Sequence, residues 1–143
     1  MKIEQLSEVI QHTSNVPMGY FFETNQQGLG LVEETKKIAH NIWKQTLFVI
    51  HCDQIDFVDI EDLLKSYTPS IKTTPLTFYF ANIDKISKKL RDYIIHNFSI
   101  CRDENIHKNS HVIYHVSQDE NQNYQDDWND YVICHSVHYT FER

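Results

Sequence analysis

Five short apolar runs, separated by polar loops and by segments of helical periodicity, constrain the fold of this chain more than any other feature. The runs lie at 18–23, 47–52, 76–81, 111–117 and 132–138. Each has the length of a buried strand and is too short for a buried helix. The run at 76–81 is almost purely apolar, which is typical of a strand covered on both faces.

The segments between the runs have the apolar spacing of amphipathic helices. Helices are predicted at 3–12, at 33–44 and in the later part of 53–67. A fourth helix is predicted to follow Ser87, a good N-cap residue, while Pro69 and Pro75 are expected to bracket a loop. Strands alternating with helices imply right-handed crossovers and a mostly parallel sheet covered on both faces. The fold class is therefore α/β, with residues 1–143 forming a single domain.

The length and the cysteine content fit an intracellular domain. A domain of 143 residues buries enough surface to need no metal or disulfide. The three cysteines have no CxxC spacing, so reduced thiols are expected. No run of 18 apolar residues is present, so a soluble, cytoplasmic protein without membrane contact is expected.

The charge of the chain argues against direct DNA binding. The formal net charge is −7, whereas a protein that binds phosphates needs a basic surface. The acidic stretch at 119–130 is most simply a solvated surface, and its functional interpretation is a docking surface for a basic partner.

The segment after the first strand occupies the place of a phosphate-binding loop. Gly28 and Gly30 are present, but the loop ends in Glu33-Glu34-Thr35-Lys36-Lys37 and not in Gly-Lys-Ser/Thr. Two carboxylates at a helix start stabilise the empty terminus and repel a triphosphate. Lys36 imitates the missing lysine, but Thr35 stands in place of the preceding glycine. An ordinary loop and helix start are favoured.

Nine histidines raise the question of a metal site. His111 and His115 are expected on one face of a strand, where the two rings would be roughly 13 Å apart, too far for one ion. His135 and His138 are expected on the neighbouring strand, with Cys134 as a conceivable ligand. We predict no metal site and hydrogen-bonded, partly buried histidines. Cys52 is predicted to have a packing role.

Several strings, taken in order, resemble the AAA+ ATPase domain of the sigma-54-dependent transcriptional activators. That family has a phosphate loop, a helix ending in Ala-x-x-Ile-His, a strand ending in Phe-Val-x-x-Asn-Cys, a magnesium-binding Asp-Glu strand and a sensor strand. The corresponding strings are Ile38-Ala39-His40-Asn41-Ile42-Trp43, Leu47-Phe48-Val49-Ile50-His51-Cys52, Leu76-Thr77-Phe78-Tyr79-Phe80-Ala81-Asn82-Ile83-Asp84, His111-Val112-Ile113-Tyr114-His115-Val116-Ser117 and Phe141-Glu142-Arg143.

The resemblance implies a three-layer P-loop-NTPase-like core with a mostly parallel five-stranded sheet. It implies the spatial order second, third, fourth, first, fifth for the strands. The helical lid domain of the family is expected to be absent, because the chain ends where the lid would begin.

The departures from the family pattern remove the catalytic groups. The Asp-Glu pair falls on Ala81 and Asn82, neither of which is a carboxylate that can hold magnesium. The loop lysine falls near Thr35. The two arginines that act on a neighbouring subunit are replaced by Gln125 and Tyr131.

Two further positions complete the comparison. Ser117 keeps a polar residue at the sensor position. The interval between Cys52 and Leu76 lacks the family's Gly-Ala-Phe-Thr-Gly-Ala loop, which contacts the sigma factor.

The resemblance thus implies a pseudo-ATPase without a cofactor, acting in transcription regulation through contacts with a protein partner, as a monomer or dimer. Two alternatives stay open. One is a weak nucleotide-binding ATPase that holds ATP and magnesium through Lys36 or Lys37 and Asp84. The other is an unrelated small α/β enzyme that uses the histidines.

Overall fold

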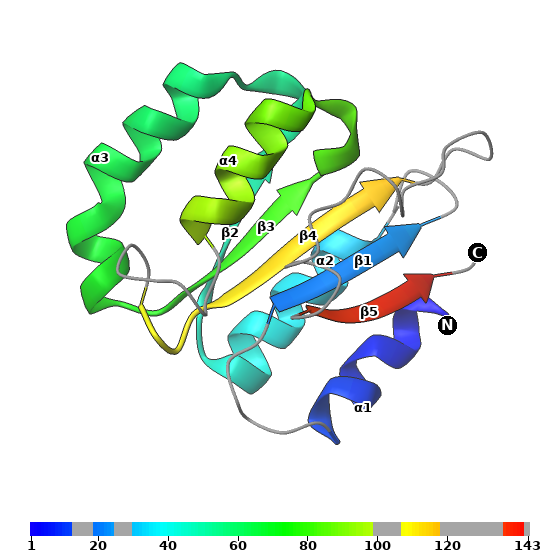
Figure 1. The fold of residues 1–143 in the computed structure, drawn as a ribbon. Helices are drawn as coiled ribbons and strands as arrows, with labels where there is room; N and C mark the ends of the chain where they lie inside the picture. The colour runs from blue at the N-terminus through cyan, green and yellow to red at the C-terminus, as the bar shows by residue number, and fades with distance from the viewer. Residues whose placement is uncertain (13–18, 25–29, 99–106, 118–135, 142–143) are drawn as a thin grey trace.

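A parallel five-stranded sheet lies between two layers of helices (Figure 1). The computed structural model describes residues 1–12, 19–24, 30–98, 107–117 and 136–141. The strands are β1 (Gly19–Thr24), β2 (Thr46–His51), β3 (Leu76–Ala81), β4 (His111–Ser117) and β5 (Ser136–Phe141). The helices are α1 (Leu6–Gln11), α2 (Leu31–Ile38), α3 (Phe57–Thr73) and α4 (Lys88–Phe98), with shorter helical turns η1 (Ile3–Gln5), η2 (Ala39–Trp43), η3 (Cys52–Gln54) and η4 (Ile83–Lys85).

The strand order is β2-β3-β4-β1-β5, and every neighbouring pair is parallel. The predicted order and the predicted parallel sheet are both confirmed. This order is compatible with a P-loop-like core. From β1, which lies between β4 and β5, the chain crosses to β2 at the edge of the sheet and then returns through β3 and β4 toward β1.

One face of the sheet packs against α3 and α4. Phe78, Phe80 and Tyr114 project from the sheet into this core, and Ile60 of α3 and Phe98 of α4 cover them. Ser87 caps α4 as predicted, accepting a hydrogen bond of 3.2 Å from the backbone N–H of Leu90.

The opposite face packs against α1 and α2. Tyr20, Phe22 and Tyr79 lie in this second core, with Leu6 of α1 and Leu31 of α2 above them. Because side chains alternate along a strand, β3 supplies Phe78 to one core and Tyr79 to the other. This two-sided burial is the reason the strands are apolar throughout.

Three predicted boundaries are wrong. The helix predicted at 33–44 begins at Leu31 and continues as α2 and the π-helical turn η2 to Trp43. Pro69 does not begin a loop, because α3 runs through it to Thr73; a proline removes one main-chain donor, a local cost that this long helix tolerates. The fifth strand spans Ser136–Phe141 and not 132–138.

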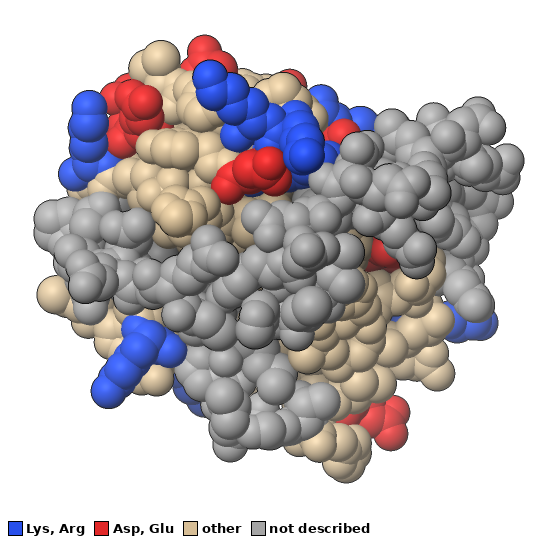
Figure 2. All heavy atoms as spheres, viewed as in Figure 1, with Lys and Arg blue, Asp and Glu red and all other residues tan. Residues whose placement is uncertain are grey.

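The chain ends of the described part lie side by side at β5 (Figure 1). The N-terminal ammonium of Met1 donates a hydrogen bond of 3.1 Å to the carbonyl of Thr140. In the view of Figure 2, basic and acidic side chains are interspersed over the α3 and α4 side. Across the described residues, no helix combines the length and apolar character needed to span a membrane.

Candidate functional site

A hollow of about 790 Å³ opens at the carboxyl ends of β3 and β4, opposite the start of α2. Ligands of open α/β sheets bind at this edge, because loops diverge there. Gly30 and Glu33 of the α2 start line it, together with Tyr79, Asn82 and Ser117 of the strand ends. The structure therefore brings together Gly30, Ala81, Asn82 and Ser117, four residues that the sequence placed at a degenerate nucleotide site.

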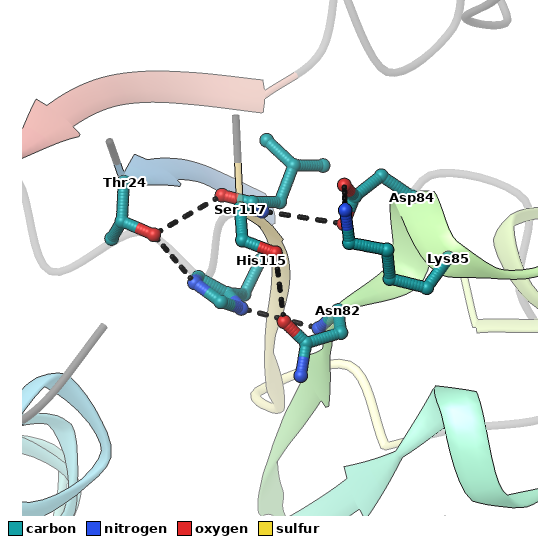
Figure 3. Close-up of polar contacts among 7 residues, drawn as sticks. Thr24, Asn82, Asp84, Lys85, His115 and Ser117 are labelled. Atoms are coloured by element: carbon teal, nitrogen blue, oxygen red, sulfur yellow. Dashed lines mark hydrogen bonds and ion pairs between the residues drawn. The ribbon is translucent and has the colours of Figure 1, made fainter. Parts of the chain in front are cut away.

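Asn82 is held at the end of β3 by the side chains of two residues of β4, Ser117 and His115. Its backbone is left-handed, with φ of 58°, a conformation that asparagine tolerates better than most residues. The Ser117 hydroxyl donates to the Asn82 side-chain oxygen at 3.0 Å, and the Asn82 N–H donates to His115 Nδ1 at 3.1 Å (Figure 3).

Asp84, in the helical turn η4, has a buried carboxylate next to the end of β4. Its carboxylate is 1% exposed and accepts a hydrogen bond of 3.2 Å from the Ser117 N–H. The Lys85 ammonium lies 3.5 Å from its other oxygen (Figure 3). Asp84 therefore ties η4 to the end of β4 and has no free oxygen directed at the hollow.

His115 is neutral and uses both ring nitrogens. Because Nδ1 accepts from Asn82, the proton is on Nε2, which lies 3.1 Å from the Thr24 hydroxyl (Figure 3). Burial lowers the pKa of His115 to about 4. A ring with both nitrogens engaged has no lone pair available as a general base.

His111 is a core residue on the same face as His115, as predicted. Its Nδ1 lies 3.1 Å from the Gln45 side-chain oxygen, which also accepts from the Thr77 hydroxyl at 2.8 Å. The Trp43 ring stacks on it at 3.8 Å. Burial lowers the pKa of His111 to about 4. The prediction of buried, hydrogen-bonded histidines is confirmed for both residues.

His138 was assigned to the strand next to β4, and this is wrong. It lies on β5, which β1 separates from β4, and its ring stacks on Phe21 at 4.9 Å. Within the described ranges, no three His, Cys, Asp or Glu side chains are grouped closely enough to hold a metal ion.

Helix α2 begins earlier than the position at which the resemblance placed the phosphate-loop lysine. The motif lysine follows the last glycine and opens the helix; here Gly30 is the N-cap with φ of 85°, and Leu31 follows it. Leu31 is fully buried. Thr35 lies one turn later, where its hydroxyl donates to the Leu31 carbonyl at 2.7 Å. Lys36 is exposed and lies outside the hollow.

Cys52 is a packing residue, as predicted. It is fully buried in the core under α3 and α4. Burial, followed by the charges of Asp53 and Asp84, raises the pKa of its thiol to about 12. The thiol therefore stays protonated near neutral pH and is a poor nucleophile.

Some predicted positions lie outside the described residues. They are Gly28, Gln125, Tyr131, Cys134, His135 and the acidic stretch 119–130. The interval between Cys52 and Leu76 is described, and η3 and α3 fill it. The expectation that this interval lacks a long inserted loop is therefore confirmed.

Sequence reasoning missed the contributions of Tyr79, Thr24 and Asp53 to this site. Tyr79 lies in the middle of an apolar strand, where the pattern predicts that a tyrosine belongs to the hydrophobic core. The available signals were its position two residues before the end of the strand and its alternation with Phe78 and Phe80.

Comparison with the models of known protein families found no match, and a search of curated proteins found no significant relative. The assignment of function therefore rests on the geometry of the site and on the resemblance of the short strings.

Proposed function

We propose that this chain is a noncatalytic P-loop-like domain, similar to a degenerate sigma-54 activator ATPase domain, which acts in transcription regulation through contacts with a protein partner. The observation that carries the proposal is the state of Asn82. It occupies the end of β3, where the family has a carboxylate for magnesium, and its side-chain oxygen is engaged by Ser117. A neutral amide held in this way does not supply the charge that a metal-bound phosphate requires.

The start of α2 supports the same proposal. A buried Leu31 stands where the phosphate loop has its lysine, and an aliphatic side chain cannot neutralise a phosphate. Glu33 lies in the first turn of this helix and lines the hollow. Its carboxylate repels a triphosphate at the helix terminus that would otherwise attract one.

The geometry disfavours the alternative of a nucleotide site with unusual ligands. Lys36 and Lys37 lie on the outer surface of α2, away from the hollow. Asp84 is engaged by the Ser117 N–H and by Lys85. A magnesium ion would have to break both contacts to recruit it.

The geometry also disfavours an enzyme that uses the histidines. His111 and His115 are 5% and 4% exposed, and both belong to core hydrogen-bond networks. Neither presents a free ring nitrogen to the hollow.

The test of the noncatalytic assignment is the titration of ATP with magnesium by calorimetry, combined with a phosphate-release assay. We expect no saturable heat and no phosphate release above background. The Lys36→Ala variant and its matched control Lys37→Ala should be indistinguishable from the wild type. Magnesium-dependent turnover that disappears in Lys36→Ala alone would show that the domain is an ATPase.

The protein-contact part is tested separately, with RNA polymerase holoenzyme carrying sigma-54. Biolayer interferometry should detect binding of the immobilised domain that is the same with and without ATP. Absence of binding would contradict the transcription assignment and leave the noncatalytic assignment to the first experiment.

A further inference from the structure

We propose that the hollow at the carboxyl ends of β3 and β4 binds an organic cation, an ammonium or guanidinium group, through Glu33, Asp53 and the hydroxyl of Tyr79. The proposal goes beyond the proposed function, which assigns no ligand to the hollow. It rests on a tyrosine hydroxyl that opens onto the hollow and has no protein partner within the described ranges, on the charge of the lining and on the size of the hollow.

Tyr79 is the first observation. Its side chain is 1% exposed, yet it lines the hollow, and within the described ranges its hydroxyl forms no hydrogen bond. A buried phenol hydroxyl normally has a partner. Burial and the charge of Glu33 raise the pKa of Tyr79, so the neutral hydroxyl oxygen is available to accept an N–H from a ligand.

The charge of the lining is the second observation. Glu33 and Asp53 both line the hollow, and neither forms an ion pair within the residues that the structure describes. The lysine of the lining, Lys85, is paired with Asp84 at 3.5 Å, and the histidines of the lining are His51 and the neutral His115. Two carboxylates without a counter-ion disfavour an anion and favour a cation.

The size of the hollow selects an organic cation over a metal ion. A volume of about 790 Å³ lies in the range of small-molecule sites. The Asn82 amide nitrogen points away from Ser117 (Figure 3). It offers donors to an oxygen of the same ligand. A molecule with a cationic group and a carbonyl or carboxylate oxygen satisfies both the acceptors of the hollow (Glu33, Asp53 and the Tyr79 hydroxyl) and the donors of the Asn82 amide.

Two sources could supply this chemistry: a free amino acid or amine, and the arginine or lysine side chain of a partner protein. The probes are L-arginine, its uncharged isostere L-citrulline and the blocked peptide acetyl-Gly-Arg-Gly-amide. Each is titrated into the full chain by calorimetry. We expect saturable binding of L-arginine, of the arginine peptide or of both. If L-arginine binds, the affinity for L-citrulline should be at least about tenfold lower than that for L-arginine. Tighter binding of the peptide than of L-arginine indicates a protein source, and the reverse indicates a free metabolite.

The variants assign the contacts. Glu33→Gln should weaken the better arginine probe about tenfold, as loss of a charge-assisted hydrogen bond implies. Tyr79→Phe keeps the ring packing and should weaken it about three- to fivefold. Glu34→Gln, one residue along the same helix and paired with Lys37, is the matched control and should bind as the wild type does. Thermal unfolding verifies that each variant is folded.

The proposal is overturned if neither arginine probe binds, if citrulline binds as tightly as arginine, or if Glu33→Gln leaves the affinity unchanged. None of these results depends on ATP. Failure here is therefore distinguishable from failure of the proposed function, which the ATP and phosphate-release measurements decide.

Discussion

At the scale of single residues, the buried histidines link the core to the edge of the site. His115 joins three strands, because it contacts Thr24 of β1 and the backbone of Asn82 after β3 from its own place on β4. His111 does the same at the other end of β4 through Gln45. Both rings are neutral when folded, and their protonation opposes folding.

The two histidines predict a loss of stability in mild acid. Their pKa falls from the usual 6.5 to about 4 on folding, so between these values the unfolded chain binds more protons than the folded one. The stabilisation is complete above pH 6.5 and is lost as the pH falls toward 4. Each histidine should contribute roughly 2–3 kcal/mol to this loss.

Urea denaturation at pH 7 and at pH 4.5 measures the effect. The double variant His111→Gln and His115→Gln keeps hydrogen-bonding side chains that do not titrate. It should show a smaller loss of unfolding free energy between the two pH values than the wild type shows. An equal loss in both proteins would mean that other groups govern the acid sensitivity.

At the scale of elements, the helix formed by α2 and η2 is bounded by two left-handed residues. Gly30 has φ of 85° at its start, and Lys44 has φ of 56° at its end. Glycine adopts this conformation without strain, whereas a residue with a Cβ does not. Gly30 therefore fits the helix start without strain, whereas the backbone of Lys44 at the helix end is strained.

The two helix ends predict opposite effects of exchanging side chains. Gly30→Ala should destabilise the protein by about 1 kcal/mol. The cost is one of backbone conformation alone, because a Cβ there has no atom within 4 Å.

Lys44→Gly should stabilise the protein by about 0.5–1 kcal/mol, because glycine adopts the left-handed conformation without strain. Urea denaturation at pH 7 tests both, and a destabilising Lys44→Gly would show that the lysine side chain has a role that outweighs the strain.

At the scale of the whole molecule, the parallel sheet with the order β2-β3-β4-β1-β5 is compatible with a P-loop-like fold, and the proposed function makes a prediction about its assembly. Glu33 is exposed at the helix start where a phosphate would be held. Gln125 and Tyr131, which the resemblance places at the positions of the family's two arginines, lie outside the described residues. Under the proposed function the chain neither binds a phosphate nor supplies these arginines, so subunit association should not depend on nucleotide.

The resulting prediction is a monomer, or at most a dimer, whose mass does not change on adding ATP. Light scattering of the purified chain with and without ATP and magnesium measures it. The formal net charge of −7 further disfavours close packing of identical faces. A six- or sevenfold rise in mass on adding nucleotide would identify a functional ring ATPase.

The sequence pattern by itself determined the fold class, and the strand order was predicted from the resemblance of the short strings. Five apolar runs, each typical of a strand buried on both faces, predict a parallel sheet. The runs at 76–81 and 111–117 coincide with the observed bounds of β3 and β4. Hydrophobic burial is non-directional and repeats along the chain, so it can be read from the pattern. The bounds of an edge strand are harder to predict from the sequence. β5 pairs only with β1 and is partly exposed along most of its length, so its apolar pattern is weak and its predicted bounds were wrong.

The tertiary structure decided the content of the site. Asp84 and Ser117, 33 residues apart, meet at 3.2 Å, and Tyr79 faces a hollow with Glu33, which is distant in sequence. Helix α2 begins at Leu31, so Thr35 lies one turn inside the helix and not at its start. Hydrogen bonds and charge pairs act over a few ångströms and in fixed directions. Their partners are therefore set by how strands align in the sheet, which composition and periodicity do not encode.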